Sequence, residues 1–235
     1  MKPLYIFDVD GTLTPSRGKI DSEFEKWFEH FATRNAVYFV TGSDRPKTIE
    51  QLGKNIYSLA VRVYNCSGND VWEQDRNIYT SPWTLPTHAR LYLEKKLTES
   101  KFPLRTGQHI EDRPGLVNFS IVGRGATLKE RMMYIEWDHI HNERNNIVEE
   151  FRHNFGLTLE ISAGGETGMD IYPRGANKSQ IIKDFDKEMF LNFFGDRMDK
   201  HGNDAPLAVE IAKRNGSNYH VKDWKETWKL LREMA

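Results

Sequence analysis

A single cysteine, Cys66, is present among the 235 residues of this sequence. One cysteine excludes an internal disulfide, and such sparing use is typical of a reducing compartment, so we expect a cytoplasmic protein in which Cys66 is a small buried residue. The sequence also lacks a long apolar run, and a charged residue, Asp8, follows only a few apolar residues at the N-terminus. We therefore expect neither a membrane span nor a signal peptide.

Charge of one sign is not in excess either. The 33 lysines and arginines and the 34 aspartates and glutamates are interspersed, which gives a formal net charge of −1. Without a basic tract the chain offers no groove for a polyanion, so we expect no nucleic-acid partner and disfavour a polynucleotide phosphatase. The length suits one large domain or two modest ones, in either case with a real hydrophobic core.

Apolar strands alternate with helices in the first and last parts of the chain. Strands are expected at Leu4–Phe7, Val37–Val40, Arg62–Cys66, Phe190–Phe194 and Tyr219–Val221. Helices are expected near residues 22–35, 46–52, 178–187 and 205–214, and a last one after the capping pair Asp223 and Glu226. This alternation predicts an α/β fold with a parallel, Rossmann-like sheet covered on both faces, whose active site lies at the carboxyl ends of the strands.

The middle of the chain has a different pattern. Strands are expected at residues 116–122, 157–161 and 169–172, among helices near residues 87–100, 128–140 and 142–155. Polar residues inside these strands favour an antiparallel sheet with one open face. Proline and glycine mark both junctions, so we predict a catalytic core of residues 1–82 and 176–235 with an inserted α+β cap domain at residues 83–175.

Two carboxylates, Asp8 and Asp10, follow the first strand and lead into Gly11. Alternation along an extended chain puts them on the same side, where two close carboxylates repel unless a cation or a proton shares the site. A turn explains Asp10 and Gly11 but not a charge at the end of a buried strand. The pair predicts phosphoryl transfer, with Asp8 as nucleophile and Asp10 as proton shuttle.

Three further groups of polar residues fall where an α/β core would present them. Thr41 and Ser43 follow the second strand and can donate to a phosphoryl oxygen, and Lys178 can neutralise charge in the transition state. Each could be an ordinary turn or surface residue when taken alone. Together with Asp8 and Asp10, however, the acids after the Phe190–Phe194 strand complete an oxygen-ligand Mg²⁺ site. The residues expected to bind the metal are Asp8, Asp10, Asp196 and Asp204.

These residues, in this order, resemble the motifs of the haloacid dehalogenase superfamily of Mg²⁺-dependent phosphotransferases. The inserted domain resembles that superfamily's larger, second type of cap (C2). Over nearly its whole length the chain resembles the eukaryotic-type phosphomannomutase family. The segments that carry this resemblance are Phe7–Thr14, Arg17–Asp21, Arg113–Ser120, Gly123-Arg124, Glu130-Arg131, Gly164-Gly165, Asp170–Pro173, Gly175, Lys178 and Phe193–Asp196.

The resemblance implies an isomerase that converts mannose 6-phosphate into mannose 1-phosphate through an aspartyl phosphate, with a hexose bisphosphate as activator. It also implies that two copies pair through their caps. Arginine suits the phosphate that is not reacting, because its planar and permanently charged fork binds phosphate in a bidentate manner. The residues that would bind the substrate are Arg17, Arg113, Asn118, Arg124, Arg131 and Asp170.

Three departures from the family pattern keep other functions open. Gly168 stands where the family usually has a serine that touches the sugar phosphate, and the loop at residues 197–201 differs. Thr41 replaces a glycine and resembles what phosphatases of the superfamily carry there. The alternatives are a sugar-phosphate phosphatase, in which water takes the phosphoryl group, and a non-catalytic sugar-phosphate-binding protein. Intact Asp8 and Asp10 argue against the latter.

Overall fold

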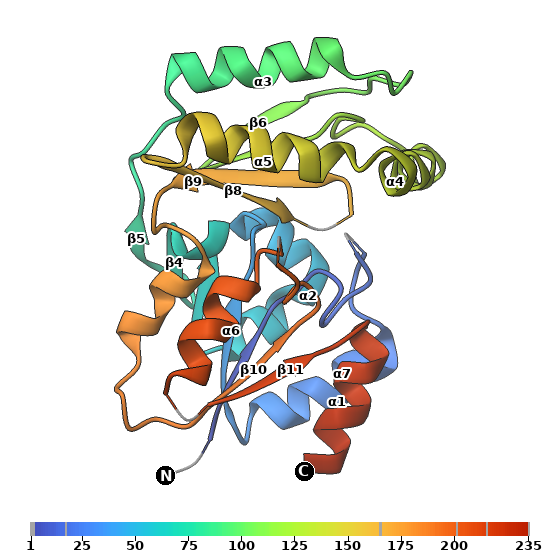
Figure 1. Ribbon diagram of the computed structural model, residues 1–235. Coiled ribbons are helices and arrows are strands. Elements are labelled where there is room, and N and C mark those ends of the chain that lie inside the picture. The colour runs from blue at the N-terminus through green and yellow to red at the C-terminus, as the bar shows by residue number, and fades with distance from the viewer. Residues whose placement is uncertain (1–2, 17, 165, 201, 215, 235) are drawn as a thin grey trace. The chain divides into compact units, whose positions relative to one another are not determined.

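The computed structural model describes residues 3–16, 18–164, 166–200, 202–214 and 216–234 (Figure 1). The chain divides into two compact units. Residues 1–81 and 177–235 form the first, named the core unit, and residues 82–176 form the second, named the cap unit. Each unit has its own sheet and its own cluster of buried apolar side chains.

The core unit is built on a seven-stranded sheet in the order β11-β10-β1-β2-β3-β4-β5. The first five strands in this order are parallel, and β4 and β5 add antiparallel pairings at one edge. The strands are β1 (Leu4–Phe7), β2 (Ala36–Val40), β3 (Arg62–Asn65), β4 (Asp70–Glu73), β5 (Arg76–Thr80), β10 (Leu191–Gly195) and β11 (Ser217–His220).

Helices cover both faces of this sheet, because successive residues of a strand point to opposite sides. Tyr5 and Phe7 of β1 join a cluster with α1, α2 and α7, whereas Ile6 joins a cluster with α6 and the 3-10 helix η2. None of the helices in the described part of the chain combines the length and apolarity that a membrane-crossing helix needs. The helical elements are α1 (Ser22–Ala32), α2 (Arg45–Leu59), η1 (Cys66–Gly68), η2 (Lys178–Asp184), α6 (Ala205–Ala212) and α7 (Trp224–Met234).

The expectation of an α/β core is confirmed, with two corrections. The sheet is mixed rather than wholly parallel, because β4 and β5 pair in an antiparallel manner at one edge. This hairpin was not predicted. Every residue of β5 is exposed, so the strand lacks the alternation of apolar and polar residues that reveals a half-buried strand. The segment that begins at Lys178 is a 3-10 helix that ends at Asp184, not an α-helix that reaches residue 187.

The cap unit has a four-stranded antiparallel sheet in the order β6-β7-β9-β8, as the polar strands predicted. Its apolar face packs with α3, α4 and α5. In Figure 1, α3 and α5 lie on the same side of β8 and β9. Strand β6 was missed because three of its four residues are charged. The elements are α3 (Thr87–Glu99), β6 (Ile110–Arg113), β7 (Leu116–Phe119), α4 (Leu128–His141), α5 (Glu143–Phe155), β8 (Leu159–Gly164) and β9 (Gly168–Pro173).

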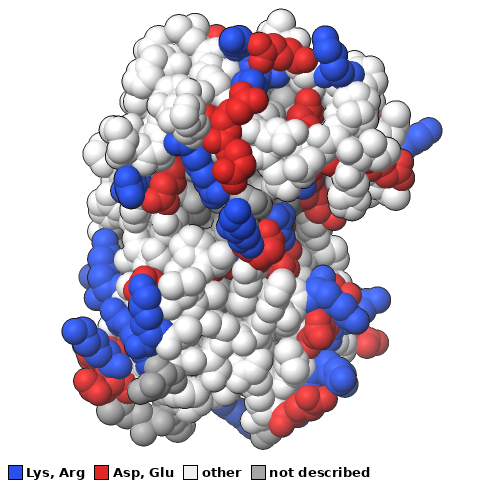
Figure 2. Space-filling model, in the orientation of Figure 1, with Lys and Arg blue, Asp and Glu red and all other residues white. Residues whose placement is uncertain are grey.

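The other face of the cap sheet carries a row of polar residues. Antiparallel pairing aligns Glu111 with Asn118, Asn118 with Asp170, and Asp170 with Ser162, so the four lie across the sheet on one side. Acidic and basic side chains are also intermixed on the face of the molecule shown in Figure 2.

The aromatic cluster beneath β1 should dominate the stability of the core unit. Phe28 is fully buried, and its ring meets Phe7 edge-on at 5.3 Å and Phe24 at 5.6 Å. We expect Phe28→Ala to lower the free energy of unfolding in urea by about 3–5 kcal/mol, because it removes these contacts and leaves a cavity. Phe190→Ala is the matched control: that side chain is 43% exposed, and the change should cost about 0.5 kcal/mol or less. Equal losses in the free energy of unfolding of the two variants would contradict the dominant role of this cluster.

Candidate functional site

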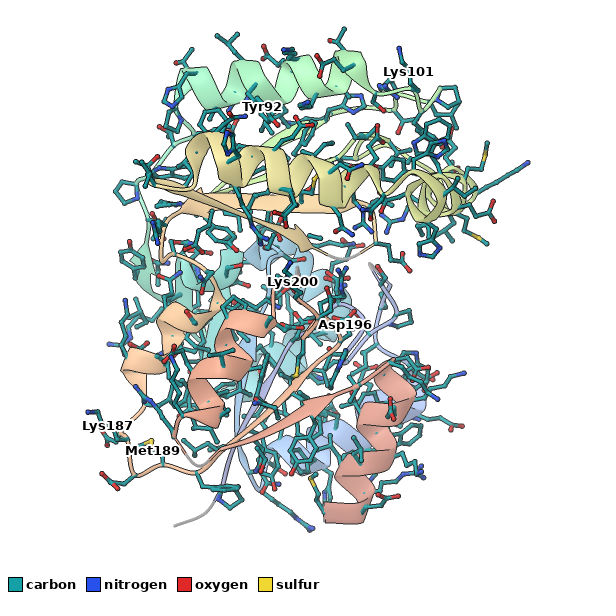
Figure 3. All side chains as sticks on the ribbon, viewed as in Figure 1. Tyr92, Lys101, Lys187, Met189, Asp196 and Lys200 are labelled. Atoms are coloured by element: carbon teal, nitrogen blue, oxygen red, sulfur yellow. The ribbon has the colours of Figure 1, made fainter. Side chains whose placement is uncertain are left out.

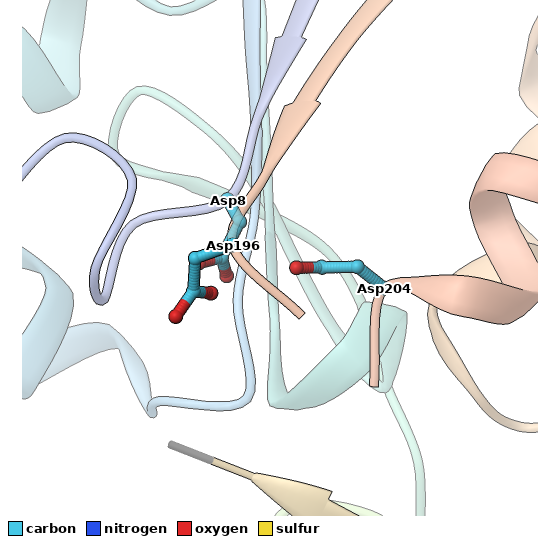
Figure 4. Close-up of side chains that lie close together, drawn as sticks. All are labelled: Asp8, Asp196 and Asp204. Atoms are coloured by element: carbon cyan, nitrogen blue, oxygen red, sulfur yellow. The ribbon is translucent and has the colours of Figure 1, made fainter. Parts of the chain in front are cut away.

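Three aspartates meet at the carboxyl ends of the parallel strands (Figure 4). Asp8 follows β1 and Asp196 follows β10, and the pairing of Phe7 with Phe194 brings the two strand ends to the same edge. Asp204 lies at the start of α6. One carboxylate oxygen from each residue lies within 4.8 Å of the others. The structure thus brings Asp8 together with Asp196 and Asp204, which lie far from it in the sequence.

Two glycines allow this close approach. Gly11 has φ +80, and a Cβ atom there would lie 2.4 Å from Asp196 Oδ2. A Cβ atom on Gly195 would lie 2.6 Å from Asp204 Oδ2. Any side chain at either position would displace a carboxylate, and at Gly11 it would also strain the backbone.

Lys178 is the cation of this cluster. Its side chain is fully buried, and its Nζ lies 2.6 Å from Asp8 Oδ1 and 2.7 Å from Asp204 Oδ1. Asn177 caps η2 by accepting a hydrogen bond from the Ser179 N–H, which fixes the start of the helix that carries Lys178. Burial alone would lower the pKa of Lys178, but the carboxylates of Asp204 and Asp8 raise it, so the amine is charged.

The acids outnumber the single lysine. Burial raises the pKa of Asp8 to about 7 even though Lys178 opposes the shift, and burial together with the charge of Asp8 raises the pKa of Asp196 to about 9. Burial is the largest cause of both shifts, and the charges of the neighbouring acids add to it. Carboxylate oxygens in this number and spacing are ligands suited to a hard divalent cation. The donor set therefore fits a metal ion.

Asp10 has a separate set of partners. Its Oδ2 accepts a hydrogen bond of 3.3 Å from Ser43 Oγ, and Ser43 N–H donates to Thr41 Oγ1 at 3.1 Å. The Asp10 carboxylate stands outside the group of three acids, and the expected contact of Asp10 with the metal, through its backbone carbonyl, stays a prediction. Thr12 Oγ1 donates to Asp8 Oδ2 at 3.3 Å. Among the predicted catalytic residues, Lys178 thus contacts Asp8, whereas Ser43 links Asp10 with Thr41.

The loop after β10 closes on itself around Asp204. The Arg197 N–H donates to Asp204 Oδ2 at 3.0 Å, and the Asp204 N–H donates back to the Arg197 carbonyl at 3.1 Å. Asp196 and the exposed Lys200 belong to the same loop, as Figure 3 shows. These backbone contacts fix the third carboxylate of the cluster.

Sequence reasoning missed Gln51, which contacts Asp10 directly. Its Nε2 donates to Asp10 Oδ1 at 2.9 Å, and its side chain is buried. A glutamine within α2 belongs to no recognisable motif. The signal that could have revealed it is a polar residue between Ile49 and Leu52, on the side of the helix that faces the core.

The polar face of the cap sheet brings together most of the predicted substrate residues. Asn118 Nδ2 donates to Asp170 Oδ1 at 2.8 Å, and Arg124 Nη1 donates to Asn118 Oδ1 at 3.4 Å. Glu111 pairs with Arg113 and also with Arg124, at 3.0 Å from the Arg124 Nε. Glu111 was not predicted, because it belongs to the unrecognised strand β6.

Arg131 completes this arginine group from α4. A capping box between Thr127 and Glu130 starts the helix, so Arg131 lies in its first turn, where it is buried and pairs with Glu166 at 3.2 Å. Burial and the nearby charges of Arg113 and Arg131 lower the pKa of Arg124. Like charges held this close favour an anion as ligand. Arg17, the fourth predicted arginine, lies outside the described residues.

Comparison with known proteins identifies relatives over most of the chain. A sequence model of the family described as eukaryotic phosphomannomutase matches residues 24–235. Phosphomannomutase 1 of Mus musculus is 32% identical over 218 residues, which cover 88% of this chain and 83% of the mouse protein. The phosphomannomutase of Saccharomyces cerevisiae is 29% identical over 242 residues, which cover 98% of this chain and 93% of the yeast protein.

Solved structures establish the fold. The C-terminal domain of Candida albicans trehalose-6-phosphate phosphatase matches with a TM-score of 0.67 at 14% identity, covering 99% of this chain and 91% of that one. A haloacid dehalogenase-like hydrolase from Bacteroides thetaiotaomicron matches with a TM-score of 0.61 at 11% identity over the full length of both chains. The fold is haloacid dehalogenase-like, and the chain belongs to the eukaryotic phosphomannomutase family.

Proposed function

We propose that this protein is a Mg²⁺-dependent phosphotransferase that interconverts mannose 6-phosphate and mannose 1-phosphate through a phosphorylated Asp8. The observation that carries the proposal is the buried contact between Lys178 Nζ and Asp8 Oδ1, beside the carboxylates of Asp196 and Asp204. Membership of the family supports a sugar phosphate as substrate, and the names of the relatives support mannose phosphates within that class.

In the first half of the reaction the Asp8 carboxylate attacks the phosphorus of a hexose bisphosphate. The bond between phosphorus and the hexose oxygen breaks, and that oxygen takes a proton from Asp10. In the second half Asp10 removes a proton from the free hydroxyl of a hexose monophosphate, and that oxygen attacks the phosphorus on Asp8. The bond between phosphorus and the Asp8 oxygen breaks, which restores the carboxylate and forms the bisphosphate; isomerisation results when the bisphosphate presents its other phosphate to Asp8. Lys178, Thr41 and Ser43 stabilise the negative charge of the phosphoryl oxygens in both halves.

The acidic cluster supplies the metal ligands in this proposal. Asp8, Asp196 and Asp204 offer their carboxylates, and Asp10 offers its backbone carbonyl rather than its side chain. Bound Mg²⁺ would neutralise charge on the phosphoryl group during transfer. The raised pKa of Asp196, about 9, supports this assignment because burial and the charges of Asp8 and Asp204 disfavour the charged carboxylate, which a bound cation would stabilise.

The cap unit would hold the phosphate that is not reacting. Arg113, Arg124 and Arg131 form the anion site, and Asn118 with Asp170 offers oxygen and nitrogen atoms to the sugar hydroxyls. A mutase needs such a second site, because the same hexose must present each of its two oxygens to Asp8 in turn. A hydrolase does not need it.

A sugar-phosphate phosphatase is the second candidate, and Thr41 favours it. The Thr41 hydroxyl stands beside Ser43 at the end of β2, where the family pattern has a glycine without a side chain. An additional hydroxyl near the phosphoryl group could assist an attacking water.

The two activities separate by their products. With mannose 1-phosphate, a hexose 1,6-bisphosphate and Mg²⁺, we expect mannose 6-phosphate to accumulate well in excess of inorganic phosphate. Asp8→Asn should lower turnover by about 10³-fold or more, because an amide cannot form the phosphoenzyme. Product analysis by phosphorus NMR measures both outcomes. Stoichiometric release of phosphate without the isomer would assign the phosphatase instead.

Metal binding should depend on pH with a defined sign. In the metal-free fold the pKa values of about 7 for Asp8 and about 9 for Asp196 exceed 3.8, the ordinary pKa of an aspartate in water. The folded state therefore binds more protons than the unfolded state at pH values between 3.8 and about 9. By linkage the metal-free protein loses stability as pH rises through that window. Mg²⁺ relieves the repulsion, so the increase in melting temperature that it causes should be larger at about pH 8.5 than at about pH 6.

Asp196→Asn provides the control for this pH dependence. It removes the acid with the larger shift, so the stability of the metal-free variant should fall less as pH rises, and Mg²⁺ should stabilise it less at high pH. An Mg²⁺ effect that was the same at both pH values in the parent protein would contradict the site.

The cap arginines should act on binding of the sugar phosphate. Arg124→Lys keeps the charge but loses the planar fork, so we expect KM for mannose 1-phosphate to rise about 10-fold or more. Turnover of p-nitrophenyl phosphate, which has no second phosphate, should change little. Arg174→Lys is the control, because the exposed Arg174 donates to the Gly156 carbonyl and lies outside the arginine group. Equal effects of both variants would contradict the role.

A further inference from the structure

Gln51 makes an unusual number of contacts with one short segment of the chain. Its Nε2 donates to Asp10 Oδ1 at 2.9 Å, to Thr14 Oγ1 at 3.3 Å and to the Gly18 carbonyl at 3.4 Å. Its backbone carbonyl accepts a hydrogen bond of 2.8 Å from the Ile20 N–H. The side chain is 1% exposed. A single buried residue therefore contacts Asp10, the proposed proton donor, and also Thr14, Gly18 and Ile20.

The chemistry of these partners fixes the orientation of the amide. A carboxylate oxygen and a backbone carbonyl accept hydrogen bonds and cannot donate them, so the nitrogen of Gln51 must face Asp10 and Gly18. Gln51 Oε1 then points elsewhere, and it is a buried atom without a hydrogen-bond partner among the described residues. A buried acceptor without a partner destabilises the fold. Stability alone does not explain a glutamine here.

A break in α2 frees the carbonyl of Gln51. Gly53 has φ 79 and ψ 153, which is not helical, so the regular hydrogen bonding of the helix is interrupted two residues after Gln51. The carbonyl is available to Ile20 as a result. The first part of α2, which starts from the Asp44 N-cap directly after Ser43, thus positions both Ser43 and Gln51 against the Asp10 carboxylate.

We propose that Gln51 is a positioning residue for Asp10. It holds Oδ1 by the hydrogen bond from Nε2 and thereby directs Oδ2, the oxygen near Ser43 Oγ, toward the reacting hexose oxygen. This role rests on the proposed function. When Asp8 attacks, the bond from phosphorus to the hexose oxygen breaks, the electron pair stays on that oxygen, and the proton on Asp10 Oδ2 moves to it. The same oxygen of Asp10 takes a proton back in the second half.

The leaving group provides the test. A hexose oxygen is a poor leaving group and needs the proton from Asp10, whereas p-nitrophenolate leaves without one. Gln51→Met keeps the size of the side chain and removes the donor. We expect kcat for mannose 1-phosphate with hexose bisphosphate to fall about 10²-fold, with KM nearly unchanged, while turnover of p-nitrophenyl phosphate falls less than about 3-fold. Gln108→Met, an exposed glutamine of the cap unit, is the matched control and should alter neither.

The melting temperature separates positioning from structural support. Gln51→Met removes the unpartnered oxygen, which favours the fold, and also the donor to Asp10, Thr14 and Gly18, which opposes it. Because the two effects oppose each other, the melting temperature with Mg²⁺ should change by only a few degrees. Gln51→Glu, which keeps the shape and places an acceptor opposite Asp10, should show the same selective loss with the hexose substrate. Adding Gln51→Met to Asp10→Asn should cause little further loss with that substrate, because both changes disable one proton transfer.

Two outcomes would overturn the role of Gln51. One is an equal loss of turnover with both substrates in Gln51→Met and Gln51→Glu, and the other is full activity of both variants with the hexose substrate. In either case the parent protein would still be active, and the proposed function would stand. A parent protein that transferred phosphate from neither substrate would overturn the proposed function and this role with it.

Discussion

The burial of several carboxylates around one lysine is the constraint on which the core unit depends. Moving a charge out of water is costly, and Lys178 compensates only part of that cost because it contacts Asp8 and Asp204 but not Asp196. Burial, together with the charges of Asp8 and Asp204, raises the pKa of Asp196. Several elements keep these charges together. The ends of β1 and β10 lie side by side, Gly11 and Gly195 leave room for the carboxylates, and η2 carries Lys178. Without a cation this arrangement of carboxylates costs free energy, and it is suited to a divalent cation.

The proposed chemistry separates two carboxylates that are only two residues apart. Asp8 contacts a lysine and lies among acids, whereas Asp10 accepts hydrogen bonds from Ser43 and Gln51, which make no hydrogen bond with Asp8. Different surroundings give two identical side chains different tasks, here nucleophile and proton carrier. The Asp-x-Asp spacing puts both on one side of the chain, but the neighbours that distinguish them come from other elements. Residues far away in the sequence therefore decide the chemistry of a local motif.

Local sequence patterns predicted the features that depend on residues close together in the sequence, namely the strands, the helices and the aspartates that follow strands. Alternating strands and helices revealed the α/β core, and Asp8 and Asp196 could be found because each follows an apolar strand. Glu111 and Gln51 could not be found in this way. Glu111 lies in β6, whose charged residues do not give the pattern of a strand. Gln51 lies just before the helix break at Gly53 and contacts Asp10, Thr14 and Gly18. Contacts across elements of this kind leave no periodicity in the sequence.

Under the proposed function, the arginine group of the cap unit would be a binding site that is ordered before its ligand arrives. Arginine loses much rotamer freedom when it is fixed, and a site that is already ordered binds more tightly. Glu111 holds Arg113 and Arg124 at once, whereas Glu166 holds Arg131 alone and its own side chain is 50% exposed. Because exposed ion pairs are weak, a phosphate displaces Glu166 at less cost than Glu111. Within the proposed function, Arg131 is then the arginine that exchanges its carboxylate for the substrate, while the other two remain in place.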